Sequence, residues 1–80
     1  MGQDITIQAY FDEHAPQQNK VRTINCLVRG GIGTMDELCA ASMERLYKMR
    51  NMGDLTRELA LAMRDKYAAE NQIDMKKQEG

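Results

Sequence analysis

The chain has 80 residues, a net charge of −1 at pH 7 and a hydrophobic content of 42%. A chain of this length forms one small domain and buries only about 60% of the surface that it exposes when unfolded, so we expect modest stability. The near-neutral charge excludes a strong overall attraction to nucleic acid, because non-specific phosphate binding needs clustered Lys and Arg. Any nucleic-acid contact must therefore be local.

Residues 1–18 fit two patterns. Ile5 and Ile7 alternate as in a strand, whereas Asp4 is a suitable cap for a helix. One face of that helix would carry Ile7, Tyr10, Phe11 and His14. We favour the short helix, and we treat residues 1–18 as an extension that precedes the main domain.

A helix over residues 19–29 follows. The residues expected to face the core are Val21, Ile24, Leu27 and Val28, and those expected to face solvent are Arg22, Asn25 and Arg29. The glycines at positions 30 and 31 end this helix, because glycine adopts the positive φ that a C-terminal cap requires. Ile32 is then placed to anchor the turn to the core.

Two capping signals predict two further short helices. Thr34 and Glu37 have the spacing of a capping box, in which each side chain bonds to the backbone amide of the other residue. The residues of this helix expected to point inward are Met35, Leu38 and Cys39. Ser42 is expected to cap the next helix, whose apolar residues are Met43, Leu46, Tyr47 and Met49.

A second glycine-containing turn, over residues 51–53, precedes the longest predicted helix, residues 54–70. We expect Asp54 to cap this helix. The predicted inward stripe consists of Leu55, Leu59, Ala62 and Met63, with Tyr67 at its edge and Arg57, Glu58, Arg64 and Asp65 toward solvent. Residues 71–80 are polar, and we expect a disordered tail.

These elements predict an all-α fold, a compact bundle of four to five short helices with helix-hairpin-helix elements over residues 19–70. Cys26 and Cys39 are accompanied by neither a second cysteine pair nor paired histidines, which disfavours a zinc site and indicates buried reduced thiols. There is no signal peptide and no apolar run of membrane-spanning length. We therefore expect a cytoplasmic protein without a membrane partner.

Catalytic motifs are lacking. His14 has no nucleophile or second ligand at a suitable spacing, and no phosphate-binding loop or spaced pair of carboxylates occurs. We therefore predict a non-enzymatic protein with no cofactor, no metal and no small-molecule substrate.

Three motifs carry a family resemblance over about residues 21–67. They are VRTINCL at residues 21–27, GIGT at residues 31–34 and NMG at residues 51–53, the last of which comes before the long helix. Together they resemble the C-terminal domain of the bacterial RNA polymerase alpha subunit. The first motif is fairly specific, whereas the two turns are shared by many helix-hairpin-helix proteins.

This resemblance implies a domain that contacts the DNA minor groove upstream of promoters and also contacts transcription factors. Arg22 matches the arginine that enters the minor groove, Asn25 matches the asparagine beside it, and Cys26 falls close to the DNA-facing surface. Gly53 matches the hairpin glycine whose amide lies near a phosphate, and Thr56 falls where the family has a serine with the same role. The implied partner is double-stranded DNA with an A·T-rich minor groove, whose negative potential favours a guanidinium.

The chain departs from the family pattern in the charges around these motifs. Val28, Asp54 and Leu55 stand where the family commonly has lysines, so phosphate contacts would be lost. Arg29, Arg50 and Arg57 are candidates to restore positive charge. The alternative hypothesis is a protein-interaction adaptor of the same fold that has lost DNA binding, with transcription factors or polymerase subunits as partners.

Overall fold

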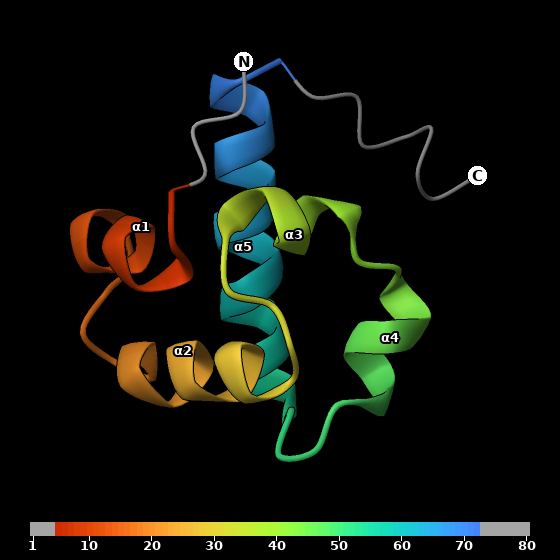
Figure 1. Ribbon diagram of the computed structural model, residues 1–80. Coiled ribbons are helices and arrows are strands. Elements are labelled where there is room, and N and C mark those ends of the chain that lie inside the picture. The colour runs from red at the N-terminus through yellow and green to blue at the C-terminus, as the bar shows by residue number, and fades with distance from the viewer. Residues whose placement is uncertain (1–4, 73–80) are drawn as a thin grey trace.

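The computed structural model describes residues 5–72, and these form a bundle of helices without named strands (Figure 1). The elements are α1 (Ile7–His14), α2 (Lys20–Arg29), α3 (Met35–Ala40), α4 (Met43–Lys48) and α5 (Asp54–Glu70). The prediction of an all-α fold with four to five helices is confirmed. Asp4 and residues 73–80 of the predicted tail lie outside the described residues.

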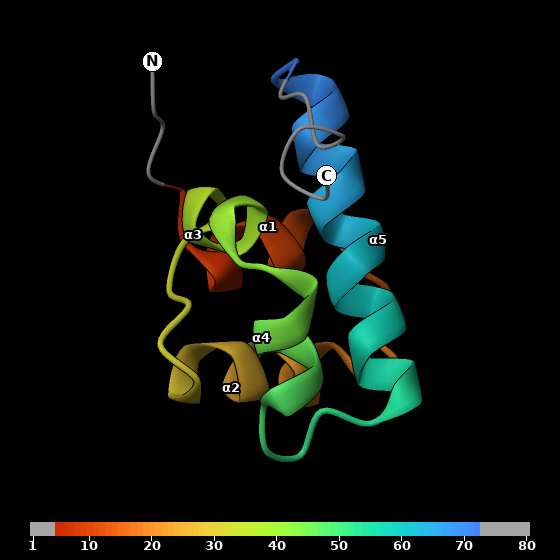
Figure 2. The ribbon, with the colours of Figure 1, turned by 90° about the vertical axis from the view of Figure 1, so that its right-hand side faces the viewer.

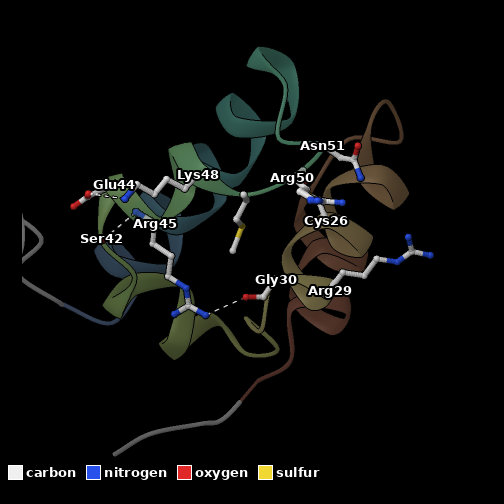
Figure 3. Close-up of a pocket in the computed structure, with 10 residues that line it drawn as sticks. Cys26, Arg29, Gly30, Ser42, Glu44, Arg45, Lys48, Arg50 and Asn51 are labelled. Atoms are coloured by element: carbon white, nitrogen blue, oxygen red, sulfur yellow. Dashed lines mark hydrogen bonds and ion pairs between the residues drawn. The ribbon is translucent and has the colours of Figure 1, made fainter.

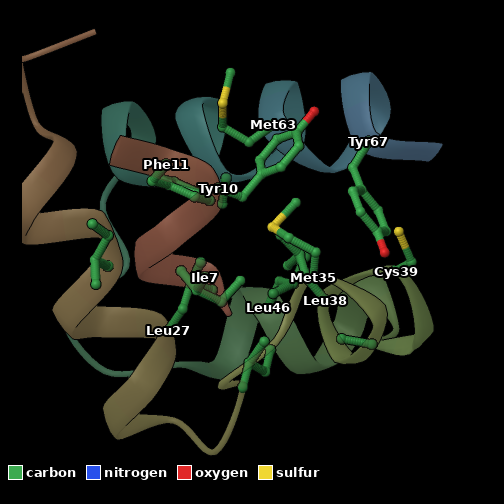
Figure 4. Close-up of a cluster of buried hydrophobic side chains, with 14 of the residues drawn as sticks. Ile7, Tyr10, Phe11, Leu27, Met35, Leu38, Cys39, Leu46, Met63 and Tyr67 are labelled. Atoms are coloured by element: carbon green, nitrogen blue, oxygen red, sulfur yellow. The ribbon is translucent and has the colours of Figure 1, made fainter. Parts of the chain in front are cut away.

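The long helix α5 runs along one side of the molecule, and the four shorter helices lie on the other side (Figures 1 and 2). Both α2 and α3 pack against α5, and α1 packs against α2. All five helices contribute to a single core (Figure 4). Its largest fully buried side chains include Phe11, Ile7, Leu27, Ile32, Met35, Leu38 and Leu46.

Both patterns found near the N-terminus correspond to a feature of the structure. Ile7 N donates to Gly33 O at 2.9 Å and Met35 N donates to Ile5 O at 2.9 Å, so residues 5–7 lie alongside residues 33–35 like two short antiparallel segments. The helix begins at Ile7, the last residue of this pairing, and its N-cap is Thr6 and not Asp4 as predicted; the Thr6 hydroxyl oxygen accepts from Ala9 N at 3.1 Å. The predicted short helix is therefore confirmed.

In α2 the buried face is displaced from the predicted one. Val21 and Val28 were expected inside, but their exposed fractions are 64% and 50%. The buried residues are Thr23, Ile24, Cys26 and Leu27. These four residues are related by spacings of three and four and share one face of the helix. The small Thr23 and Cys26 allow neighbouring elements to approach this face closely. Val21 and Val28 therefore lie at its two edges. The expectation that Arg22, Asn25 and Arg29 face solvent is confirmed.

The turn after α2 follows the sequence prediction. Ile32 N donates to Leu27 O at 2.9 Å and Gly31 N donates to Val28 O at 3.1 Å, the bond pattern of a Schellman motif. Gly31 has a φ of +93°, which a residue with a side chain rarely adopts. Ile32 is fully buried and anchors the turn to the core.

Both predicted caps of the short helices are present. Thr34 and Glu37 form the capping box at the start of α3, and Ser42 caps α4 by accepting from Arg45 N at 3.1 Å. The inward residues of α3 are buried as expected. In α4, Leu46 is fully buried, whereas Tyr47 is exposed and lies under the guanidinium of Arg57, 4.3 Å from the ring centroid.

The second turn and α5 differ from the prediction in three respects. The residue with positive φ is Asn51, at 63°, whereas Gly53 has a φ of −76°. Gly53 is the N-cap, so Asp54 is the first helical residue and not the cap. The buried stripe is Thr56, Ala60, Met63, Arg64, Tyr67 and Ala68. Leu55, expected inside, is 62% exposed, because α5 is rotated so that the small Ala60 and Ala68 face the packed helices.

Both cysteines are free and buried, as expected. In the described part of the chain, none of the helices has the length and apolar character needed to cross a membrane.

Candidate nucleic-acid interface

Five residues are predicted from the sequence to contact DNA, and all five line one surface hollow: Arg22, Asn25, Cys26, Gly53 and Thr56. This hollow, here called the hairpin groove, has a volume of about 1100 Å³ and lies between α2, the second turn and the start of α5. Its lining residues are Asn19, Val21, Arg22, Asn25, Cys26, Arg29, Met49, Asn51, Met52, Gly53, Asp54, Leu55 and Thr56. Segments almost thirty residues apart in the sequence therefore meet at one place.

Helix α2 supplies the polar wall of the hairpin groove. Arg22, Asn25 and Arg29 are exposed and follow one another at spacings of three and four residues, so they lie along one face. The opposite face of α2 is packed into the core through Ile24 and Leu27. The burial of that face fixes the direction in which the guanidinium and amide groups point.

Cys26 connects α2 to the second turn. Its side chain is almost buried, and Sγ donates a hydrogen bond to the backbone oxygen of Arg50 at 3.2 Å. Burial raises the pKa of the Cys26 thiol, so the neutral form that donates this bond is favoured. Cys26 therefore positions the turn that carries Arg50 against α2.

The start of α5 supplies the opposite wall. Gly53 has an extended conformation that any residue adopts, and a Cβ built on it meets no atom within 4 Å. The amides that follow Gly53 lack intrahelical acceptors, as at every helix N-terminus, and no side chain caps them here. Thr56, in the same first turn, is only 3% exposed and lies at the base of this wall.

Asp54 places a carboxylate at this wall, and its charge is balanced locally. Its side chain is 89% exposed, and its Oδ1 lies 2.9 Å from Nη2 of Arg57. The Arg57 guanidinium also lies over the Tyr47 ring. Of the three arginines considered as compensating charges, Arg57 is therefore occupied by Asp54, whereas Arg29 lines the groove.

Among the described arginines that lack acidic partners, two, Arg22 and Arg29, line the hairpin groove. Within residues 5–72, Arg22, Arg29 and Arg50 form no ion pair with a carboxylate. The other described cations are engaged: the ion pairs are Lys20–Asp12, Lys48–Glu44, Arg57–Asp54, Arg64–Asp65 and Lys66–Glu70, and Arg45 donates to the Gly30 carbonyl oxygen. Positive charge available to a ligand is thus concentrated on one face, although the whole chain is slightly acidic.

The sequence named Arg29 and Arg50 as candidate compensating charges but gave neither Arg50 nor Asn51 a position at this surface. Arg29 was expected on the solvent face of α2 with Arg22 and Asn25, and the structure places it there. The positions of Arg50 and Asn51 depend on the tertiary contact made by the Cys26 thiol, which has no signal in the sequence. Among residues 5–72, no three His, Cys, Asp or Glu side chains are grouped as a metal site would require.

The fold and this surface define a small all-α domain in which two turn-connected pairs of helices present an arginine-bearing helix face beside a helix N-terminus. The family model for the C-terminal domain of the bacterial RNA polymerase alpha chain matches residues 20–59, half of the chain. The chain therefore belongs to this family.

Curated relatives agree with this assignment. The DNA-directed RNA polymerase alpha subunits of Clostridium botulinum (strain Hall), Clostridium acetobutylicum and Alkaliphilus oremlandii are each 54% identical to this chain over 33 residues. The aligned segment is 41% of this chain and 10% of each relative, so the match covers about a tenth of those proteins. No solved structure matches the chain significantly.

Proposed function

We propose that this domain binds double-stranded DNA in a transcription setting, with Arg22 and Asn25 at an A·T-rich minor groove and a phosphate at the Gly53 turn. The observation that carries this proposal is the placement of Arg22. It is exposed, it has no acidic partner among the described residues, and it shares one hollow with Asn25 and Gly53. A guanidinium in this state is available to a ligand without first breaking an internal ion pair.

The chemistry of A·T-rich DNA suits this pair of side chains. A narrow A·T-rich minor groove has an enhanced negative potential, which attracts an inserted arginine. Its base edges present only acceptors, adenine N3 and thymine O2, to which an arginine and an asparagine amide both donate. Because these acceptors are the same for A·T and T·A pairs, the expected preference is for groove shape and not for a base sequence.

The Gly53 turn is suited to a phosphate. Helix N-termini bind anions through bare amides and the positive end of the helix dipole. At Gly53 the backbone conformation does not require glycine, and a side chain would find open space, so the absence of a side chain leaves the amides accessible from outside. Thr56 is buried in the first turn of α5, and the hydrogen bond from Cys26 to Arg50 O holds the other end of this same turn against α2.

The setting is proposed from the family. The relatives are named DNA-directed RNA polymerase subunit alpha, and we infer that this domain acts with polymerase subunits or transcription factors as its protein partners. The domain itself is proposed to be non-enzymatic and to require no cofactor.

Substitution of Arg22 tests the proposal. We expect Arg22→Ala to weaken low-salt binding to an A-tract duplex about tenfold or more, since one good contact to base edges contributes about 1–3 kcal/mol of discrimination. The variant should also lose its preference for the A-tract over a G·C-rich duplex. Fluorescence anisotropy with both duplexes measures this. Lys66→Ala is the matched control, because Lys66 pairs with Glu70 far from the groove.

The adaptor hypothesis also has an observation in its favour. Val28 and Leu55 are exposed apolar side chains at positions where the family commonly has lysines, and Asp54 adds a carboxylate to the lining of the hairpin groove. If the wild-type protein fails to bind either duplex at low salt, DNA binding is rejected and a protein partner for this face becomes the better proposal.

A further inference from the structure

A second basic hollow adjoins the hairpin groove. This hollow, here called the α4 hollow, has a volume of about 810 Å³ and lies between the C-terminal end of α2, helix α4 and the second turn (Figure 3). Resting on the proposed DNA-binding function, we propose that the sugar–phosphate backbone of the bound DNA continues from the hairpin groove into the α4 hollow, where Arg29 and Arg50 contact its phosphates.

The charges of the α4 hollow support this path. Its charged lining residues are Arg29, Arg45, Lys48, Arg50 and Glu44, four cations against one carboxylate. Lys48 Nζ is held by Glu44 Oε2 at 3.0 Å, and Arg45 Nη2 donates to the Gly30 carbonyl oxygen at 3.1 Å. Arg29 and Arg50 have no such commitments among the described residues, and Figure 3 shows both on the same side of the hollow.

The two hollows share one edge. Cys26, Arg29, Met49 and Asn51 line both of them, so the hairpin groove and the α4 hollow lie side by side. Along α2, Arg29 follows Arg22 by seven residues, which corresponds to about 10 Å at 1.5 Å per residue. The Cys26 hydrogen bond holds the backbone of Arg50 beside α2 at the junction. With Arg22 in the minor groove, the adjacent DNA backbone therefore passes near Arg29 and Arg50.

The α5 side of the hairpin groove has fewer cations available to bind phosphate. On the α5 side, the charged group of the hairpin groove is Asp54, and its neighbouring cation Arg57 is already paired with it. The family commonly has lysines at the start of the last helix. In the described part of this chain, the unpaired cations Arg29 and Arg50 lie on the α2–α4 side instead. Guanidinium groups bind phosphate oxygens through two parallel hydrogen bonds, so arginines at these two positions are suited to a backbone contact.

The test compares the salt dependence of DNA binding. Each phosphate contact adds about 0.9 to the slope of log affinity against log salt concentration. We expect Arg29→Ala/Arg50→Ala to reduce this slope by about 1.8 and to weaken A-tract and G·C-rich duplexes by the same factor. The charge-retaining variant Arg29→Lys/Arg50→Lys should keep most of the slope, and Lys66→Ala should keep all of it.

The possible results separate the proposed backbone path from the proposed function. A slope unchanged in the double alanine variant, or reduced no more than in Lys66→Ala, overturns the backbone path while leaving the proposed function intact. Loss of the A-tract preference in the double variant also overturns it, because the arginines would then act in the minor groove. If the double variant does not fold by circular dichroism, Arg29→Gln and Arg50→Gln singly should each reduce the slope by about 0.9. Failure of the wild type to bind rejects the proposed function itself.

Discussion

Glu37 accepts hydrogen bonds from two backbone amides, Gly33 N at 2.7 Å and Thr34 N at 3.1 Å. Both bonds favour the charged carboxylate, and they hold the pKa of Glu37 below its ordinary value of 4.5. Through them a single side chain joins the turn after α2 to the start of α3.

This lowered pKa predicts a pH dependence of stability. The unfolded chain binds the proton more readily, so the stability contributed by Glu37 is complete above pH 4.5 and is lost as the pH falls through the lower folded-state value. We expect the Tm to fall on acidification below about pH 5, and to fall less in Glu37→Gln. Thermal denaturation followed by circular dichroism checks this. Equal pH dependence in Glu37→Gln and in the control Glu58→Gln would contradict it.

At the scale of residues, what the sequence predicts well is local. The capping box of Thr34 and Glu37 needs only a spacing of three, and it forms as predicted. The exposure of Arg22 follows from its charge and helix position. By contrast, the burial of Arg64 and the exposure of Leu55 depend on how neighbouring helices approach α5, and a single helix pattern contains no information about that approach.

At the scale of elements, the two turns use different residues for similar changes of direction. The first turn places Gly31 at a φ of +93°, and the second places Asn51 at 63°. Asparagine tolerates this region better than most residues, so the second turn leaves its glycine free of any steric requirement. The sequence predicted both turns but could not distinguish which residue carries the positive φ.

This difference predicts that alanine destabilises the protein more at Gly31 than at Gly53. Gly31→Ala forces a side chain into a strained conformation, with its Cβ 3.0 Å from Arg45 Nη2, so we expect a loss of stability of about 1 kcal/mol or more. Gly53→Ala adds a Cβ to open space and causes no backbone strain, so its loss of stability should be limited to the preference for glycine over alanine at a helix N-cap. Urea denaturation of both variants provides the comparison, and a larger loss at Gly53 would contradict the assigned roles.

Helix α1 is part of the core, although the family model begins only at residue 20. Ile7 and Phe11 are fully buried, and Tyr10 donates from its hydroxyl to Glu70 Oε1 at 2.7 Å near the end of α5. This bond lowers the pKa of Glu70. The apolar face of α1 was readable from the sequence, whereas its docking between α2 and the end of α5 required the tertiary structure.

At the scale of the whole molecule, the distribution of ion pairs matters more than the net charge. The formal charge of −1 predicts little attraction to nucleic acid. Yet most described cations are paired with carboxylates, and the unpaired arginines lie around two adjoining hollows. The net charge, summed over the sequence, cannot show that paired and unpaired cations lie in different places. That arrangement arises only when α2, α4 and the second turn are brought together.

The most direct test of the central claim is an NMR titration of the ¹⁵N-labelled protein with an A-tract duplex at low salt. We expect the backbone amide shifts of residues 22–26 and 51–56 to change together, because these residues form the two walls of the hairpin groove. Changes confined to other parts of the chain, or no changes at duplex concentrations well above that of the protein, would contradict the claim that this groove binds DNA.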